Sequence, residues 1–153
     1  MSNRAALAAV MPAMLRHEGW WDGWYRHYDS DGTLLDAHRV RTHCEFPDAG
    51  AWHYVQHSHL AWEDGREADY RFGGRLAGDR LVWDTDRFTG YGWQTLEDTL
   101  MLRLERKDVP GAHYIEMITI SPSGESRART WQWFRDGRPW KRTLCDEDRI
   151  AAP

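Results

Sequence analysis

Residues 126–146, SRARTWQWFRDGRPWKRTLCD, carry the pattern that decides the fold. Ahead of Asp136-Gly137 the side chains alternate between two faces, and one face carries Arg127, Arg129, Trp131 and Trp133. A period of two is the mark of a β-strand whose faces meet different surroundings. Asp-Gly favours a tight hairpin because both central residues of such a turn need a positive φ. The stretch therefore predicts two antiparallel strands, at residues 126–135 and 138–146.

The same arrangement recurs along the rest of the chain. Asp31-Gly32 and Asp64-Gly65 separate further alternating segments, and Pro110-Gly111 marks another turn. Because no long helical pattern separates the segments, a parallel sheet built from βαβ units is excluded. We expect the other strands at residues 20–28, 34–46, 52–62, 67–73, 80–88, 90–95, 99–106 and 112–120.

Consecutive hairpins produce an antiparallel meander, and the edges of such a sheet must be protected. Closure into a barrel removes the edges, so we expect a mainly β, up-and-down barrel of about 8–10 strands. An immunoglobulin-like sandwich is the structural rival, but it uses longer cross-sheet connections than the tight hairpins found here. Residues 1–153 are expected to form one domain, with the barrel at about residues 19–146.

A short helix is expected before the barrel, at residues 2–16. Ser2 or Asn3 can cap it, and apolar residues follow at helical spacing. Pro12 lies inside this pattern and should kink or shorten the helix.

Composition narrows the classes of function. The net charge is −4 at pH 7 with both signs interspersed, which excludes the basic stripe of a nucleic-acid-binding protein. Cys44 and Cys145 are too few for a disulfide framework, and no long apolar run suggests a signal peptide or a membrane span. We therefore expect a cytoplasmic protein whose partner is a small molecule rather than nucleic acid or a membrane. The oligomeric state stays open, with a homodimer as one alternative.

Ten tryptophans lie mostly within the alternating segments. Aromatic rings bury a large area, and each indole adds one N–H donor. The chain therefore predicts a barrel with an aromatic lining, which suits a flat organic molecule.

On segment 99–106, Leu100, Leu102 and Leu104 form the core face. On segment 52–62 the inner face is expected to carry Trp52, Tyr54, Gln56, Ser58, Leu60 and Trp62.

The residues Gly19-Trp20-Trp21 open the first strand and resemble the Gly-x-Trp pattern of lipocalins. Residues 17–26, HEGWWDGWYR, are similar to the start of small bacterial lipocalin-like proteins of unassigned function. The resemblance implies that Trp21 closes the base of the barrel and that Arg142 or Lys141 packs on its ring. It also implies a ligand inside the barrel, although some barrels of this kind are enzymes and the fold alone does not choose between the two.

Histidines offer two kinds of chemistry. His57 and His59 share a strand face, a spacing that can chelate a metal with Glu63 as a third ligand. We expect a solvent-facing, metal-free pair instead, because large aromatic residues occupy the opposite face. His38 could act as a general base or a ligand contact, since an imidazole titrates near neutral pH; a buried histidine with a purely structural role is the alternative.

Charged residues on two strands are ambiguous. If the tryptophan face of segment 126–135 points inward, Arg129 enters a region of low dielectric and needs an anion or acceptors. Segment 112–120 can present either Met117 or Glu116 to the interior. We place Met117 inside and expect Glu116 to be a solvated charge. Near the C-terminus, Glu147 is also expected in solvent.

These observations converge on a barrel that binds one small aromatic or apolar molecule, which could carry a carboxylate. The apolar wall is predicted to consist of Trp21, Tyr25, Tyr54, Trp83, Met117, Trp131 and Trp133. His38, Gln56 and Arg129 are predicted to supply the polar contacts that orient the ligand. No cofactor and no metal are expected.

Two other functions remain open. One is a cofactor-free enzyme, such as a lyase, isomerase or cyclase. In that case His38 would move a proton and Arg129 would hold an anion or stabilise developing negative charge. The other is a haem-binding barrel with one of the eight histidines as axial ligand.

Overall fold

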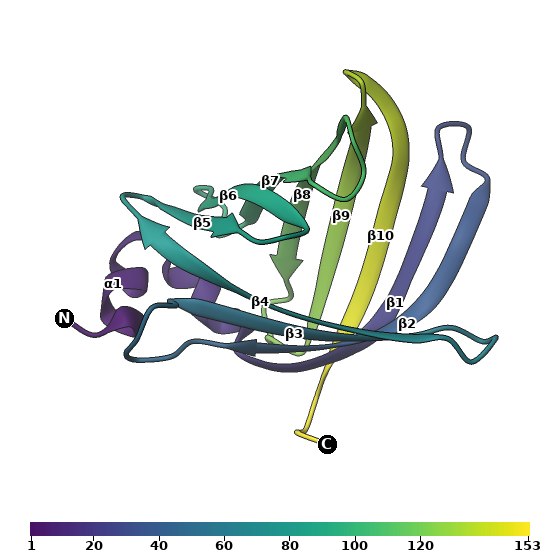
Figure 1. Ribbon diagram of the computed structural model, residues 1–153. Coiled ribbons are helices and arrows are strands. Elements are labelled where there is room, and N and C mark those ends of the chain that lie inside the picture. The colour runs from purple at the N-terminus through teal and green to yellow at the C-terminus, as the bar shows by residue number, and fades with distance from the viewer.

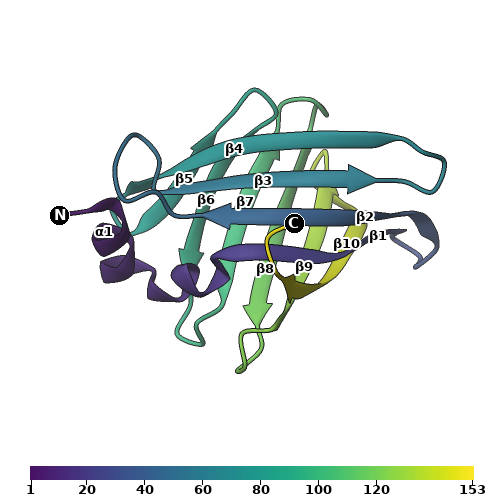
Figure 2. The same ribbon diagram turned by 90° about the horizontal axis from the view of Figure 1, so that it is seen from below.

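The computed structural model describes residues 1–153, and its ten strands close into one antiparallel barrel (Figures 1 and 2). Each strand pairs with its neighbour in the chain, and the last strand pairs with the first. The predicted mainly β, up-and-down barrel with a short N-terminal helix is confirmed. The strands are β1 (Gly19–Asp29), β2 (Leu34–Glu45), β3 (Tyr54–Ala61), β4 (Glu67–Ala77), β5 (Arg80–Asp84), β6 (Phe88–Gln94), β7 (Leu100–Arg106), β8 (Ala112–Ile120), β9 (Ser126–Arg135) and β10 (Arg138–Ile150).

The turn between β9 and β10 has the backbone that its sequence requires. Asp136 has a φ of 50° and Gly137 a φ of 78°, so both central residues lie in the left-handed region. In the Asp31-Gly32 and Asp64-Gly65 turns only the glycine is left-handed. All three pairs join consecutive antiparallel strands, as predicted.

Several strand ends differ from the prediction, and β4 continues to Ala77, four residues past its expected end. β3 begins at Tyr54, so Trp52 lies in the preceding loop and is 38% exposed instead of facing inward. β5 ends at Asp84 because the side chain of Thr85 accepts hydrogen bonds from the backbone N–H groups of Arg87 and Phe88 and forms a turn. β10 continues to Ile150, four residues past its expected end, where the charged run hides the alternation.

The N-terminal residues cover one end of the barrel (Figures 1 and 2). α1 (Asn3–Val10) gives way at Pro12 to a short 3₁₀ helix, η1 (Pro12–His17), so the predicted break occurs. The Asn3 side chain donates to the carbonyls of Gly50 and Trp52, and the Ala13 N–H donates to Gln94. The opposite end of the barrel carries the three Asp-Gly hairpins, and no helix lies over it. Neither α1 nor η1 has the length and apolarity needed to cross a membrane.

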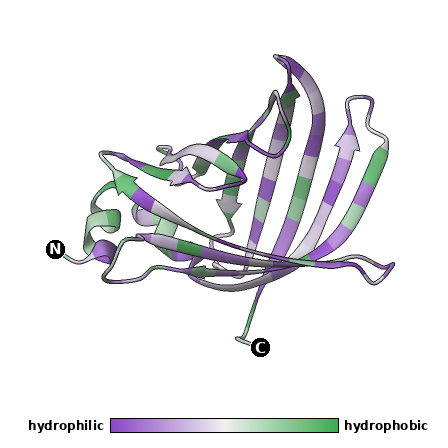
Figure 3. Ribbon diagram, in the orientation of Figure 1, coloured by the Kyte–Doolittle hydropathy of each residue, from purple (hydrophilic) through white to green (hydrophobic).

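Alternation along the strands separates the interior from the outer wall, as the bands of colour in Figure 3 illustrate. Leu100 and Leu104 are buried on β7, which confirms their predicted face. On β8 the assignment was wrong: Tyr114, Glu116 and Ile118 face inward, whereas Met117 is 43% exposed on the outer wall.

Trp21 is buried at the covered end of the barrel. Its indole N–H donates to the His17 carbonyl at 2.9 Å. The guanidinium of Arg149 lies 4.4 Å from the ring centroid, and that of Arg127 lies 4.7 Å away. A basic residue of the last strand does pack on this tryptophan, but it is Arg149, the register partner of Trp21, and not Arg142 or Lys141. The expected pair was wrong because Arg142 is opposite Tyr28, well along β1.

Candidate functional site

A cavity of about 220 Å³ lies inside the barrel, between η1 and the end that no helix covers. Hydrophobic residues supply 17 of its 27 lining residues. Met11 and Met14, next to and within η1, form part of its floor. Eight of the ten residues predicted to meet a ligand lie on its wall: Tyr25, His38, Tyr54, Gln56, Trp83, Arg129, Trp131 and Trp133.

Two of the predicted residues are not on the wall. Trp21 is packed below the cavity at the covered end, and Met117 faces the outside of the barrel. The sequence pattern missed several lining aromatic residues on other strands: Tyr70, Phe72, Phe88 and Tyr114. Alternation on β4 is regular, and a face assignment there would have found Tyr70 and Phe72, whereas Tyr114 was missed because the faces of β8 were assigned the wrong way round.

The aromatic wall is held in place by ring contacts. Trp131 stacks on Tyr114 with the ring centroids 4.8 Å apart and the planes 9° apart. The Trp131 ring is also tilted against Trp133 and Tyr25. On the facing side, a Cβ on Gly74 would lie only 2.9 Å from the Trp83 indole nitrogen, so this glycine makes room for the ring. These contacts restrict the rings and shape the cavity for a flat molecule.

Arg129 enters the cavity wall as part of a buried network. Its Nε lies 2.8 Å from a Glu116 carboxylate oxygen, and its Nη1 donates to the Tyr25 hydroxyl at 2.9 Å. Burial favours the neutral form, but Glu116 and Tyr25 hold the pKa of Arg129 well above its usual value. Glu116 is therefore the buried partner of Arg129, and the expectation that it is solvated was wrong.

A second buried ion pair lies next to the first. Arg127 Nε is 2.7 Å from a Glu147 oxygen, and Arg129 Nη1 is 3.9 Å from the same carboxylate. Although burial opposes ionisation, Arg127 and Arg129 lower the pKa of Glu147. The prediction that Glu147 is solvated was wrong because Glu147 is opposite Arg127 in the β9–β10 register. Two arginines and two glutamates thus balance in charge.

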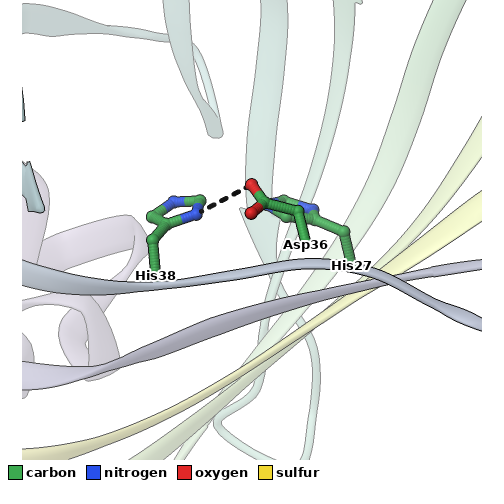
Figure 4. A group of neighbouring side chains, drawn as sticks. All are labelled: His27, Asp36 and His38. Atoms are coloured by element: carbon green, nitrogen blue, oxygen red, sulfur yellow. Dashed lines mark hydrogen bonds and ion pairs between the residues drawn. The ribbon is translucent and has the colours of Figure 1, made fainter. Parts of the chain in front are cut away.

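Near the uncovered end, His38 lies beside the carboxylate of Asp36 (Figure 4). Its Nδ1 is 3.3 Å from Asp36 Oδ2, which also accepts a hydrogen bond from the Trp62 indole at 3.1 Å. The His38 ring packs on Trp62, with the centroids 4.3 Å apart. Its Nε2 is buried and has no hydrogen-bond partner. The carboxylate fixes the orientation of an imidazole whose second nitrogen is available to a molecule in the cavity.

The rim of the cavity is cationic. Arg106 pairs with Asp108, and the Arg87 guanidinium lies 3.6 Å from the centroid of the Tyr70 ring. The ammonium of Lys141 lies 4.5 Å from the Trp133 ring centroid and the same distance from that of Trp140, and Lys141 forms no salt bridge. Burial and the neighbouring Arg106 lower the pKa of Lys141. An anionic group at the rim would meet more positive than negative charge.

The histidines of β3 face away from the cavity. His57 and His59 are exposed on the outer wall, as predicted, where they lie near Asp69 of β4. A hydrogen bond to Asp69 raises the pKa of His59.

Three inward-facing histidines make stability depend on pH. Burial, with help from Arg127, lowers the pKa of His17 to about 2. Burial and Lys141 lower the pKa of His27 to about 4, and burial also lowers that of His38. In the unfolded chain these imidazoles take up a proton near pH 6.5, whereas in the fold they stay neutral. Stability is thus complete above about pH 6.5 and falls below it, by up to about 1.4 kcal/mol per pH unit for each imidazole that stays neutral.

Urea unfolding at about pH 7 and about pH 5 checks this expectation, and the lower pH should give the lower midpoint. A His17→Gln variant removes the most strongly shifted group and should show a smaller difference between the two conditions. Equal midpoints for the unmodified protein would contradict the assignment of neutral buried imidazoles.

No family model matches this chain, and no curated protein matches it. Among solved structures, an S-type phycobiliprotein lyase from Guillardia theta is 13% identical, with a TM-score of 0.75 over 94% of both chains. A protein of unknown function from the DUF3598 family of Nostoc punctiforme is 15% identical, with a TM-score of 0.67 over 90% of this chain. This chain spans about half the length of the Nostoc protein, 49%. Likeness at such identity shows the fold alone, which here is a closed antiparallel barrel of ten strands.

Proposed function

We propose that residues 1–153 act as one ligand-binding domain that holds a small, flat, conjugated molecule with an anionic group at one end. The observation that carries the proposal is the cavity, in which an aromatic wall surrounds buried polar atoms without partners. These atoms are Nε2 of His38 and the indole nitrogens of Trp83 and Trp131, all three on lining residues. Buried polar groups are normally hydrogen-bonded, so an occupant with oxygen or nitrogen atoms suits this wall.

The charges indicate which way the molecule lies. Deep in the cavity, Arg129 is already neutralised by Glu116, so it has less attraction for an anion than the sequence suggested. Only two of its five N–H groups are used in the bonds to Glu116 and Tyr25, which leaves donors for a carbonyl or hydroxyl group. At the rim, Arg106 is likewise paired with Asp108, whereas Lys141 has no such carboxylate partner. We therefore place the apolar body inside and the anionic group at the rim.

The fold likeness supports the same class of molecule. One neighbour is named a phycobiliprotein lyase, and a bilin-like ligand is a conjugated molecule of the kind that an aromatic wall accommodates. We therefore propose open-chain tetrapyrroles as one chemical class to test, beside smaller aromatic acids.

A matched pair of dyes tests the proposal. Anilinonaphthalene sulfonate is aromatic and anionic, and N-phenylnaphthylamine has the same rings without the sulfonate. Both should bind to the folded protein with about one site, followed by dye emission and by quenching of tryptophan; biliverdin should compete with them. A Leu102→Trp variant fills the cavity and should abolish binding, whereas Met117→Trp adds the same ring to the outer wall and should not. Equal binding by both variants, each folded by circular dichroism, would refute a site inside the barrel.

The rim is tested separately with Lys141→Met, which keeps the apolar stem and removes the charge. It should weaken the anionic dye by about tenfold, the loss of roughly one charge-assisted contact, and leave the neutral dye almost unchanged. Equal effects on the two dyes would contradict an anion at the rim.

A cofactor-free enzyme is the second candidate, and the contact between Asp36 and His38 favours it. A carboxylate at one imidazole nitrogen and a free nitrogen toward the cavity suit a residue that moves a proton. A lyase, isomerase or cyclase would then lose turnover in His38→Gln while dye binding persists.

Haem binding is a third candidate, with His27 or His38 as axial ligand on the cavity wall. Titration of the protein with haemin, followed by visible absorption, tests it.

A further inference from the structure

We propose that His27, Asp36 and His38 form a binding site for a divalent transition metal such as Zn²⁺, with an open coordination position toward the cavity. Two imidazoles and one carboxylate are a ligand set that Zn²⁺ and Fe²⁺ both accept, and three protein ligands leave room for a further group. The site goes beyond the organic ligand proposed above and does not depend on it. It also revises the expectation from sequence, which considered metal binding only at His57 and His59.

Strand pairing brings the three side chains together. His27 of β1 is directly opposite Asp36 of β2, and His38 lies two residues further on the same inner face. One ligand atom from each residue lies within 4.8 Å of the other two, and Figure 4 shows the Asp36 carboxylate between the rings. Bonds of about 2.1 Å in a tetrahedral site separate ligand atoms by about 3.4 Å. The 3.3 Å between His38 Nδ1 and Asp36 Oδ2 already matches this spacing, and a separation of up to 4.8 Å must shorten by about 1.4 Å.

Neighbouring side chains orient the ligands as they do around known metals. His27 Nδ1 lies 2.7 Å from the Thr143 hydroxyl, which leaves Nε2 as the nitrogen for a metal. The Thr143 oxygen also accepts from the Trp133 indole, and Trp62 donates to Asp36. Ligating histidines commonly use their second nitrogen in this way, and ligating carboxylates are hydrogen-bonded in turn.

The two imidazoles are in the protonation state that a metal requires. Burial lowers the pKa of both His27 and His38, so each offers a lone pair at neutral pH. His38 Nε2 is buried without a partner. With a metal on Nδ1, the ring proton lies on Nε2 and can be donated to a molecule in the cavity. Both histidines line the cavity, so the open coordination position faces the same space.

One nearby charge opposes a cation and supplies a sharp control. Lys141 is close enough to His27 to lower its pKa, and it also interacts with Asp36. Removing this charge should strengthen metal binding, although it should weaken the anionic dye. Lys141→Met is therefore expected to change the affinities for the metal and for the anionic dye in opposite directions. Failure of the metal site is thus distinguishable from failure of the proposed organic ligand site.

The experiment uses the whole chain, treated with a chelator and then titrated with Zn²⁺ by calorimetry and with Co²⁺ by visible absorption. We expect one equivalent to bind, with the absorption bands of a four- or five-coordinate ion. Asp36→Asn and His27→Gln should each weaken binding by more than about tenfold, and Lys141→Met should tighten it several-fold. The control variant His57→Gln/His59→Gln removes the exposed imidazoles on the outer wall and should bind as the unmodified protein does.

Two results would overturn the site. One is the absence of stoichiometric binding in the unmodified protein. The other is binding that is lost in the outer-wall variant but retained in folded Asp36→Asn. The open position has its own test: acetohydroxamate should change the Co²⁺ spectrum, and an unchanged spectrum would show that the coordination is closed.

Discussion

Replacing Trp21 by alanine is expected to lower the free energy of unfolding by about 3–5 kcal/mol. The indole is fully buried at the covered end of the barrel, and its N–H donates to His17. Its loss leaves a cavity beneath the two ion pairs and removes the ring on which Arg127 and Arg149 pack. Urea unfolding followed by circular dichroism measures the change.

The neighbouring tryptophan provides the control. Trp20 lies on the same strand but on the outer wall, where it is only partly buried and stacks on His43. Trp20→Ala removes the same side chain without opening the interior, so its cost should be less than half that of Trp21→Ala. Similar losses in the free energy of unfolding for the two variants would show that Trp21 stabilises the fold no more than the partly buried Trp20 does.

Removing Glu116 is expected to destabilise the fold by about 3–5 kcal/mol, because it leaves the Arg129 guanidinium buried without its carboxylate. Arg129→Met should be comparably harmful, since it leaves Glu116 as a buried charge and takes a partner from Tyr25. The sequence analysis predicted Arg129 as a polar contact to the ligand, a role whose loss would weaken ligand binding and leave the fold intact. The structure changes the expectation because Arg129 is one half of a pair.

The double variant Glu116→Met/Arg129→Met separates pairing from burial. Replacing a buried ion pair by apolar side chains of similar volume is often close to neutral, so the double variant should be clearly more stable than the sum of the single changes predicts. Urea midpoints for the four proteins complete the cycle. Additive losses would mean that the two side chains act independently and that the contact contributes little.

Most of the fold could be predicted from local sequence. The hairpin signals at Asp31-Gly32, Asp64-Gly65 and Asp136-Gly137 set the turns, because a positive φ is a property of the residues themselves. Alternation of polar and apolar residues predicted the strands, and it predicted their inner faces wherever one face was clearly apolar, as on β7. Pro12 predicted the break between α1 and η1 because it removes a backbone donor.

Cross-strand register could not be predicted, and the candidate site depends on it. His27, Asp36 and His38 are ordinary polar residues in the sequence, and only the pairing of β1 with β2 brings their ligand atoms together. The same reason explains Arg149, which meets Trp21 because β10 extends to Ile150.

The buried charges show most clearly what the sequence alone could not predict. Arg129 was assigned to the interior from the tryptophans beside it. Glu116 was assigned to solvent because Met117 was placed inside, and Glu147 because it lies in a charged run near the C-terminus. Alternation reports how polar a residue is, whereas burial depends on whether a partner of opposite charge lies across the next strand. Local residue types thus determined the hairpins, the barrel and the aromatic lining; tertiary pairing decided which charges the interior could hold and which side chains meet in the cavity.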